Sequence, residues 1–207
     1  ENPGLRLGAA LAAFAGAGRD KVTLVFSDKL RSFGSWIEQL LAESLGKDGK
    51  GLVPVDAEPL GAPPVYGDER LFVAVLLKGD SAHDAALSQL AAEGHPVIRL
   101  ELNDVLELGG EFARWEIATA ATGALFAVNP FDEPNVAAAK EKTSELLDRW
   151  RKTNRLPEWK VVAEEGGLAL MTGGEDKPDS FAEGLGAHFT QAQPGDYLAI
   201  QAYLTPT

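Results

Sequence analysis

The stretch SFGSWIEQLLAESLGKDGKGLV, residues 32–53, decides the fold of the chain around it. Its apolar residues recur at the spacing of one helical stripe, which predicts a helix packed against a sheet. The stripe consists of Phe33, Trp36, Ile37, Leu40 and Leu41. Ser35 followed by Glu38 fits a capping box, with Ser32 as an alternative cap one turn earlier. With either start, the helix ends just before Gly46, which suits a left-handed cap.

Two polar residues, Gln39 and Glu43, lie four positions apart and project together from another face of this helix. Glu43 falls in the last turn, where the negative end of the helix dipole disfavours an ionised carboxylate. That environment suits a group that exchanges a proton near neutral pH. Equally, Glu43 can be a solvated carboxylate at a helix end, and Gln39 a solvent-facing amide.

A loop rich in glycine and lysine follows the helix, with the sequence GKDGKG over residues 46–51. The glycines let the backbone turn sharply, and Lys47 and Lys50 can present donors to an anion such as a sugar phosphate. The same composition also fits a flexible turn without a ligand. As a ligand loop, it is expected at the carboxyl edge of the sheet, where α/β proteins bind their ligands.

The rest of the chain alternates apolar runs with helical patterns. Strands are predicted at residues 21–27, 52–55, 71–77 and 96–102. Helices are predicted at residues 5–17, 82–92, 108–128 and 136–151, and a loop without helix at 56–68. This alternation predicts an α/β fold in which the three longer strands are parallel neighbours.

Beyond residue 153 the elements become shorter. The sequence predicts two strands at 159–163 and 168–171, a helix at 180–192 capped by Ser180, and a last strand at 197–204. We therefore expect an α/β domain over residues 1–153. A small α+β extension over residues 154–207 is expected on or beside it.

Composition limits the classes of function. The 19 basic and 31 acidic residues give a net charge of −12, which argues against a nucleic-acid partner. The sequence has no cysteine, which removes disulfides and thiolate chemistry, and its three histidines are too scattered for a metal centre. No apolar run approaches the length of a membrane span, so a cytoplasmic protein without membrane contact is expected.

Two motifs resemble those of phosphoglucose isomerases. Residues 39–47 match a glutamine, three residues, then glutamate, serine, any residue, glycine and lysine. Residues 123–136, GALFAVNPFDEPNV, closing on Lys140, resemble the C-terminal signature of the same family. The sequence of these stretches, together with PGDYLAIQAYL at 194–204, is most similar to the isomerase half of bifunctional transaldolase/phosphoglucose isomerases.

The resemblance implies a sugar isomerase (SIS) fold, a flavodoxin-like three-layer arrangement with a parallel sheet flanked by helices. It also implies interconversion of glucose 6-phosphate and fructose 6-phosphate through an enediol, in glycolysis, gluconeogenesis and the pentose phosphate pathway, without metal or cofactor. Glu43 matches the residue that carries the proton, and Lys140 the lysine that assists ring opening. Gln39, Lys47 and Glu133 match substrate-binding positions. Without the resemblance, Lys140 would be interpreted as a surface lysine.

The sequence departs from the family pattern at three places. Glu133 stands where the family usually has a glutamine, and Asn135 replaces a glycine. The glycine-glutamine-histidine motif that carries the ring-opening histidine is missing. His83 is the nearest candidate by order, although its surroundings do not match, and His95 and His188 receive no role.

The serine- and threonine-rich phosphate loop of a first SIS unit is also not found, so the chain is expected to be the second unit of a longer enzyme. We expect it to be inactive or feeble alone, and a homodimer is possible. The alternative function is a non-catalytic SIS-type module that binds a phosphosugar.

Overall fold

The computed structural model describes residues 2–157, 159–171, 178–194, 196, 198–200 and 202–205. The chain divides into two compact units, Glu1–Ala137 and Ala138–Thr207. The division falls within the first turn of α5 (Pro134–Thr153), whereas the sequence-based boundary lies after that helix. The boundary after residue 153 stays a prediction.

The first unit contains a four-stranded parallel sheet in the order β2-β1-β3-β4. Its strands are β1 (Lys21–Phe26), β2 (Val53–Val55), β3 (Arg70–Leu77) and β4 (Val97–Leu102). The prediction of three neighbouring parallel strands is confirmed, because β1 pairs with β3 and β3 with β4. The order 2-1-3-4 is that of flavodoxin-like sheets.

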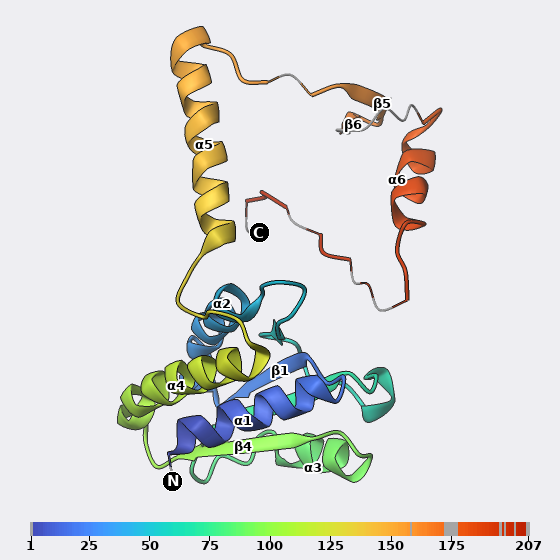
Figure 1. Ribbon diagram of the computed structural model, residues 1–207. Coiled ribbons are helices and arrows are strands. Elements are labelled where there is room, and N and C mark those ends of the chain that lie inside the picture. The colour runs from blue at the N-terminus through green and yellow to red at the C-terminus, as the bar shows by residue number, and fades with distance from the viewer. Residues whose placement is uncertain are drawn as a thin grey trace. The chain divides into compact units, whose positions relative to one another are not determined.

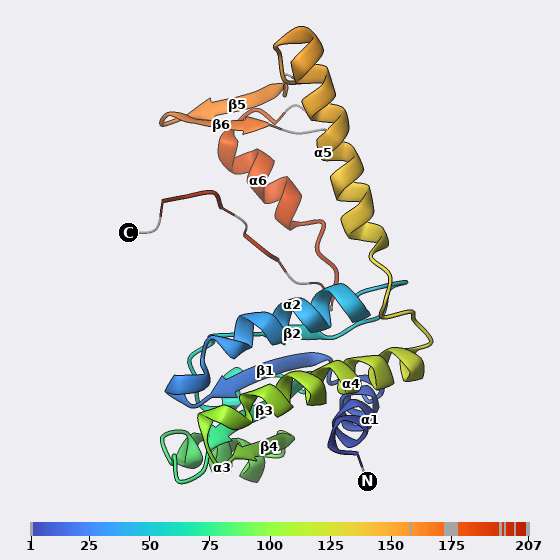
Figure 2. The ribbon, with the colours of Figure 1, turned by 90° about the vertical axis from the view of Figure 1, so that its left-hand side faces the viewer.

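Helices cover both faces of this sheet, which gives the three layers predicted from the sequence (Figures 1 and 2). One core contains α1 (Pro3–Gly16), α2 (Phe33–Leu45) and α4 (Leu108–Phe126). The other face packs against α3 (Asp84–Ala92) and the segment that contains Leu60 and Tyr66. In β3, odd-numbered residues from Leu71 to Val75 join the first core and even-numbered residues from Phe72 to Leu76 the second. This alternation is the two-residue period of a strand buried on both sides.

The end of α4 turns the chain back on itself. Ala127 adopts a left-handed conformation with φ 56°, and its N–H donates to Ala124 O over 3.2 Å. The N–H of Val128 donates to Gly123 O over 3.0 Å, which completes a Schellman motif. This turn fixes the direction in which residues 128–132 leave the helix.

The second unit holds all but the first turn of α5, a two-stranded antiparallel hairpin and a short helix. The hairpin joins β5 (Val161–Glu165) to β6 (Leu168–Met171), and α6 (Phe181–Phe189) follows. Ser180 caps α6 as predicted, since its Oγ accepts the N–H of Glu183 over 3.1 Å. The predicted last strand does not form at residues 198–200 and 202–204, and residues 197 and 201 lie outside the described residues.

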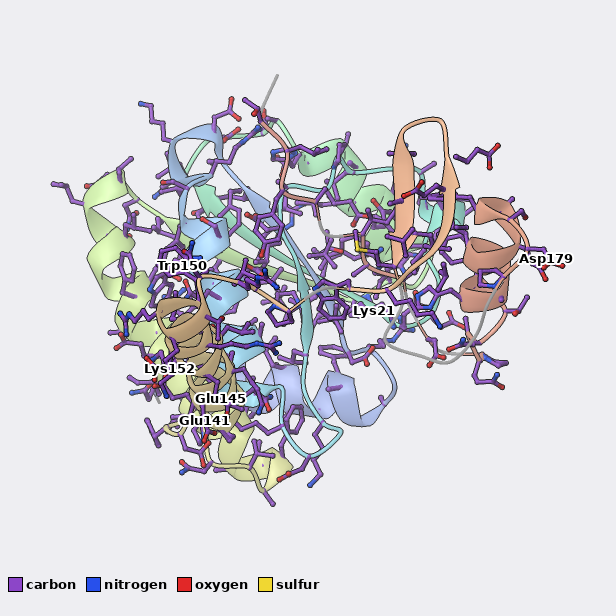
Figure 3. The ribbon with its side chains drawn as sticks, turned by 90° about the horizontal axis from the view of Figure 1, so that it is seen from above. Lys21, Glu141, Glu145, Trp150, Lys152 and Asp179 are labelled. Carbon is purple, nitrogen blue, oxygen red and sulfur yellow. The ribbon has the colours of Figure 1, made fainter. Side chains whose placement is uncertain are left out.

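Helix α5 exposes many charged side chains together with the apolar Leu146, Leu147 and Trp150. Glu141, Glu145 and Lys152 project from it in the view along its axis (Figure 3). Lys142 and Glu145 form an ion pair of 2.8 Å, and Arg151 and Asp148 one of 3.1 Å. None of the helices in the described part of the chain is long and apolar enough to cross a membrane.

Candidate functional site

Helix α2 holds the predicted proton-transfer residue rigidly. Its apolar stripe is buried, with Ile37, Leu41 and Leu45 fully enclosed in the core. Gln39 and Glu43 lie on the opposite, exposed face, and Gln39 Nε2 donates a hydrogen bond of 3.1 Å to Glu43 Oε1. The prediction that these two side chains project from one face of the helix is therefore confirmed.

The predicted capping box at the start of α2 is wrong. Ser32 occupies the cap position, but its backbone is already helical and its side chain makes no cap hydrogen bond. Ser35 Oγ instead donates to Ser32 O over 3.3 Å, so it bonds backward along the helix. The start of α2 is thus set by burial of Phe33 and Ile37 and not by a serine cap.

The pair at the end of α2 suits proton transfer to a bound molecule. One carboxylate oxygen of Glu43 is oriented by the amide of Gln39, and the group remains open to solvent. A carboxylate held in this way can accept a proton from a carbon acid that is placed within hydrogen-bonding reach.

The loop after α2 is a tight, ordered turn. Lys47 and Lys50 exchange backbone hydrogen bonds of 3.1 and 2.9 Å across Asp48 and Gly49. Both central residues have positive φ, 54° for Asp48 and 71° for Gly49, as a type I′ turn requires. The segment thus forms a defined turn, and its role as a ligand loop stays a prediction.

The loop lies at the amino edge of the sheet, and the prediction of the carboxyl edge is wrong. Val53, just after the loop, pairs with Lys21, the first residue of β1. Because α2 leaves β1 at the carboxyl edge and returns to the start of β2, its last turn reaches the opposite edge. Glu43 and the lysine loop consequently share the amino edge.

The ammonium group of Lys47 is buried and fully engaged. Its side chain is 8% exposed, and Nζ lies 2.5 Å from Asn129 O, 2.6 Å from Asp132 O and 2.6 Å from Asp132 Oδ1. These three acceptors match the three donors of an ammonium group. The hydrogen bond from Lys47 holds the pKa of Asp132 below its ordinary value. A role of Lys47 in substrate binding stays a prediction, and in this structure its donors are taken by the protein.

A second lysine and an asparagine complete this cluster. Lys50 Nζ donates to Phe126 O over 2.7 Å, at the negative end of α4. Asn129 Nδ2 donates to Asp132 Oδ2 over 3.2 Å, and Asn129 Oδ1 accepts the N–H of Phe131 over 3.1 Å. Sequence reasoning assigned no role to Asn129 or Asp132, although both lie in the quoted stretch NPFDEPNV and have side chains typical of such turns.

The remaining predicted residues lie further along the chain. Glu133 is exposed directly before α5, and its carbonyl accepts the N–H of Ala137 over 2.9 Å. Lys140 is exposed in α5, in the second compact unit. Roles of Glu133 and Lys140 at a common site with Glu43 stay predictions.

Neither histidine of the first unit adjoins Glu43. His83 follows β3 at the carboxyl edge, where its Nε2 lies 3.2 Å from Phe26 O. His95 packs against Tyr66 and Phe72, on the face of the sheet opposite α2. His188 lies in α6 of the second unit. The structure therefore assigns no ring-opening role to His83 or His95.

No family model matches the chain. It is 31% identical over 176 residues to a glucose-6-phosphate isomerase of Rubrobacter xylanophilus, which covers 65% of this chain and 40% of that protein. It is 30% identical over 172 residues to a probable glucose-6-phosphate isomerase of Halobacterium salinarum, covering 65% of this chain and 39% of that protein. The chain thus matches about 40% of the length of these relatives. The similarity supports a relationship to the phosphoglucose isomerase family.

A crystal structure of a hypothetical protein from Thermus thermophilus resembles the fold. The TM-score is 0.50 with 21% sequence identity, over 70% of this chain and 49% of that protein. This likeness agrees with a SIS-type three-layer α/β fold.

Proposed function

We propose that this chain is the part of a glucose-6-phosphate isomerase that supplies the proton-transfer carboxylate. The observation that carries the proposal is the Gln39–Glu43 pair, exposed at the end of a rigid helix in a chain 31% identical to a glucose-6-phosphate isomerase. The substrate is a phosphorylated hexose, and the reaction is aldose–ketose isomerisation.

In the proposed mechanism, Glu43 removes the proton from C2 of open-chain glucose 6-phosphate to form an enediol. The same carboxyl group then returns the proton to C1, which yields fructose 6-phosphate, while a proton passes between O1 and O2. Gln39 orients the Glu43 carboxylate through their hydrogen bond. The reaction needs a base of suitable basicity and position and no change in oxidation state of the enzyme.

The rest of the site is proposed to come partly from other residues of this chain and partly from a preceding unit in a longer protein. Lys140 assists ring opening, Glu133 lies near the substrate, and a preceding SIS unit supplies the phosphate-binding loop. The longer protein is proposed to be a bifunctional transaldolase/isomerase, because the sequence of residues 42–55, AESLGKDGKGLVPV, is most similar to the isomerase half of such enzymes. The chain matches about 40% of the length of these isomerase relatives, which supports a site that further parts of a longer protein complete.

The test compares two proteins, this chain alone and a longer protein in which a complete first SIS unit precedes it. Conversion of fructose 6-phosphate is followed by coupling to glucose-6-phosphate dehydrogenase. We expect trace activity from the chain alone and robust turnover from the longer protein. If the longer protein binds fructose 6-phosphate without turning it over, a phosphosugar-binding module is the correct function and the isomerase proposal fails.

A further inference from the structure

A lysine cluster joins the end of α2 to the segment that leads into α5. Lys47 follows Leu45, the last residue of α2, by two positions and is the donor to Asn129 and Asp132. Lys50 bonds Phe126 O at the end of α4. All of these residues belong to the first compact unit.

We infer that Lys47 and Asp132 form a latch that positions Glu43 relative to Glu133, and that Lys47 is a positioning residue and not a substrate ligand. The inference rests on the proposed isomerase function. Glu43 lies one turn before Lys47, and Glu133 directly follows Asp132 in the chain. An ion pair at this point therefore ties the predicted proton-transfer residue to a predicted substrate-binding residue.

The burial of Lys47 supports this assignment. A substrate ligand needs a donor directed toward solvent, but the three donors of Lys47 already have three protein acceptors within 2.6 Å. Transferring an ammonium group from these partners to a substrate would leave two carbonyls and a carboxylate short of donors. An exposed lysine would have free donors, and its movement to a substrate would leave no buried acceptor without a donor.

The two partners of the latch differ in exposure. The side chain of Lys47 is 8% exposed, whereas that of Asp132 is 52% exposed. Without Lys47, the Asp132 carboxylate can be hydrated in place. Without the Asp132 carboxylate, the ammonium group keeps only two acceptors and must move toward water to gain a third. Loss of Asp132 should therefore open the latch and expose Lys47.

Amine acetylation of the whole chain measures this opening without any isomerase activity. Peptide mass spectrometry compares the acetylation rate of Lys47 with that of the exposed Lys29. In the unmodified chain Lys47 should react more slowly than Lys29, because its ammonium group must first leave its three acceptors by local opening. Asp132→Ala should raise the rate at Lys47 to near that of Lys29. Asp28→Ala, which removes an exposed ion pair with Arg31, is the matched control and should leave Lys47 slow. Equal rates at Lys47 and Lys29 in the unmodified chain would overturn the latch.

Kinetics in the longer isomerase then separate positioning from substrate binding. If the latch positions Glu43, Lys47→Met and Asp132→Asn should each lower kcat, by up to about 10²-fold, the cost of a misplacement near 1 Å. The double variant should be no worse than the poorer single variant, because both remove one interaction. A rise in KM for Lys47→Met alone, with Asp132→Asn unaffected, would make Lys47 a substrate ligand and refute the inference. If no protein containing the chain isomerises, the proposed function fails, and the acetylation result still decides whether the latch exists.

Discussion

Helices α1 and α4 pack so closely that glycine is required at their crossing, which makes Gly8→Ala a sensitive test of the fold. A Cβ atom at Gly8 would fall inside contact distance of the backbone oxygen of Ala118 and 2.8 Å from the Cβ of Ala121. The carbonyl of Gly8 also accepts a buried hydrogen bond of 3.1 Å from Thr122 Oγ1. Because the closest neighbour is backbone, no rotamer change relieves the clash.

The expected magnitude combines two opposing effects. Overpacking costs about 1–3 kcal/mol, with the upper end expected where backbone must move. Alanine gains about 1 kcal/mol over glycine in a helix interior. The net loss of unfolding free energy is therefore about 2 kcal/mol, or a fall in Tm of about 4–8 °C for a chain of this size.

Gly16→Ala is the matched control on the same helix. Nothing lies within 4 Å of a Cβ atom there, so this variant should be neutral or stabilised by up to about 1 kcal/mol. Urea unfolding, followed by far-ultraviolet circular dichroism, measures both variants. If Gly8→Ala is as stable as Gly16→Ala, α1 and α4 do not meet as described and the packing argument is refuted.

Two further predictions concern α4. Burial raises the pKa of Glu111 above its ordinary value of 4.5. The stability that the protonated Glu111 carboxyl contributes is therefore lost as the pH rises from 4.5 through the raised pKa. Glu111→Gln should therefore gain stability relative to the unmodified chain between acid and neutral pH, and a difference that does not change with pH would contradict this. Ala127→Gly should stabilise by about 0.5–1 kcal/mol in urea unfolding, because the left-handed conformation at φ 56° costs alanine more than glycine. The control for Ala127→Gly is Ala124→Gly, which lies inside the helix and should destabilise the protein. A loss of stability in Ala127→Gly would show that Ala127 is not strained.

Local pattern was enough to predict the sheet and the face of α2. The runs that became β1 and β3 are buried on both sides, so their apolar character is continuous and easy to recognise. The edge strand β4 instead exposes Arg99 and Glu101 between its apolar residues. The Gln39–Glu43 pair follows from helical period alone, since residues four apart share a face.

The wrong prediction of the sheet edge and the missed partners of Lys47 have different physical origins. The edge of the sheet at which Glu43 lies follows from chain direction, because a helix that leaves a strand at one edge must end at the other. The partners of Lys47 could not be predicted locally, because they lie 82 and 85 residues along the chain. An exposed cationic loop and a buried latch have the same local sequence, and only the tertiary fold distinguishes them.

The central claim is that Glu43 is the base of an isomerase, and Glu43→Gln in the longer protein tests it most directly. The amide keeps the size of the side chain and its hydrogen bonding to Gln39, but it cannot accept the C2 proton. Glu38→Gln, an exposed change on the same helix, is the matched control and should retain full kcat. We predict that Glu43→Gln lowers kcat by about 10² to 10⁴-fold with little change in KM. Retention of more than about a tenth of the unmodified kcat, with the fold intact by circular dichroism, would show that Glu43 is not the base.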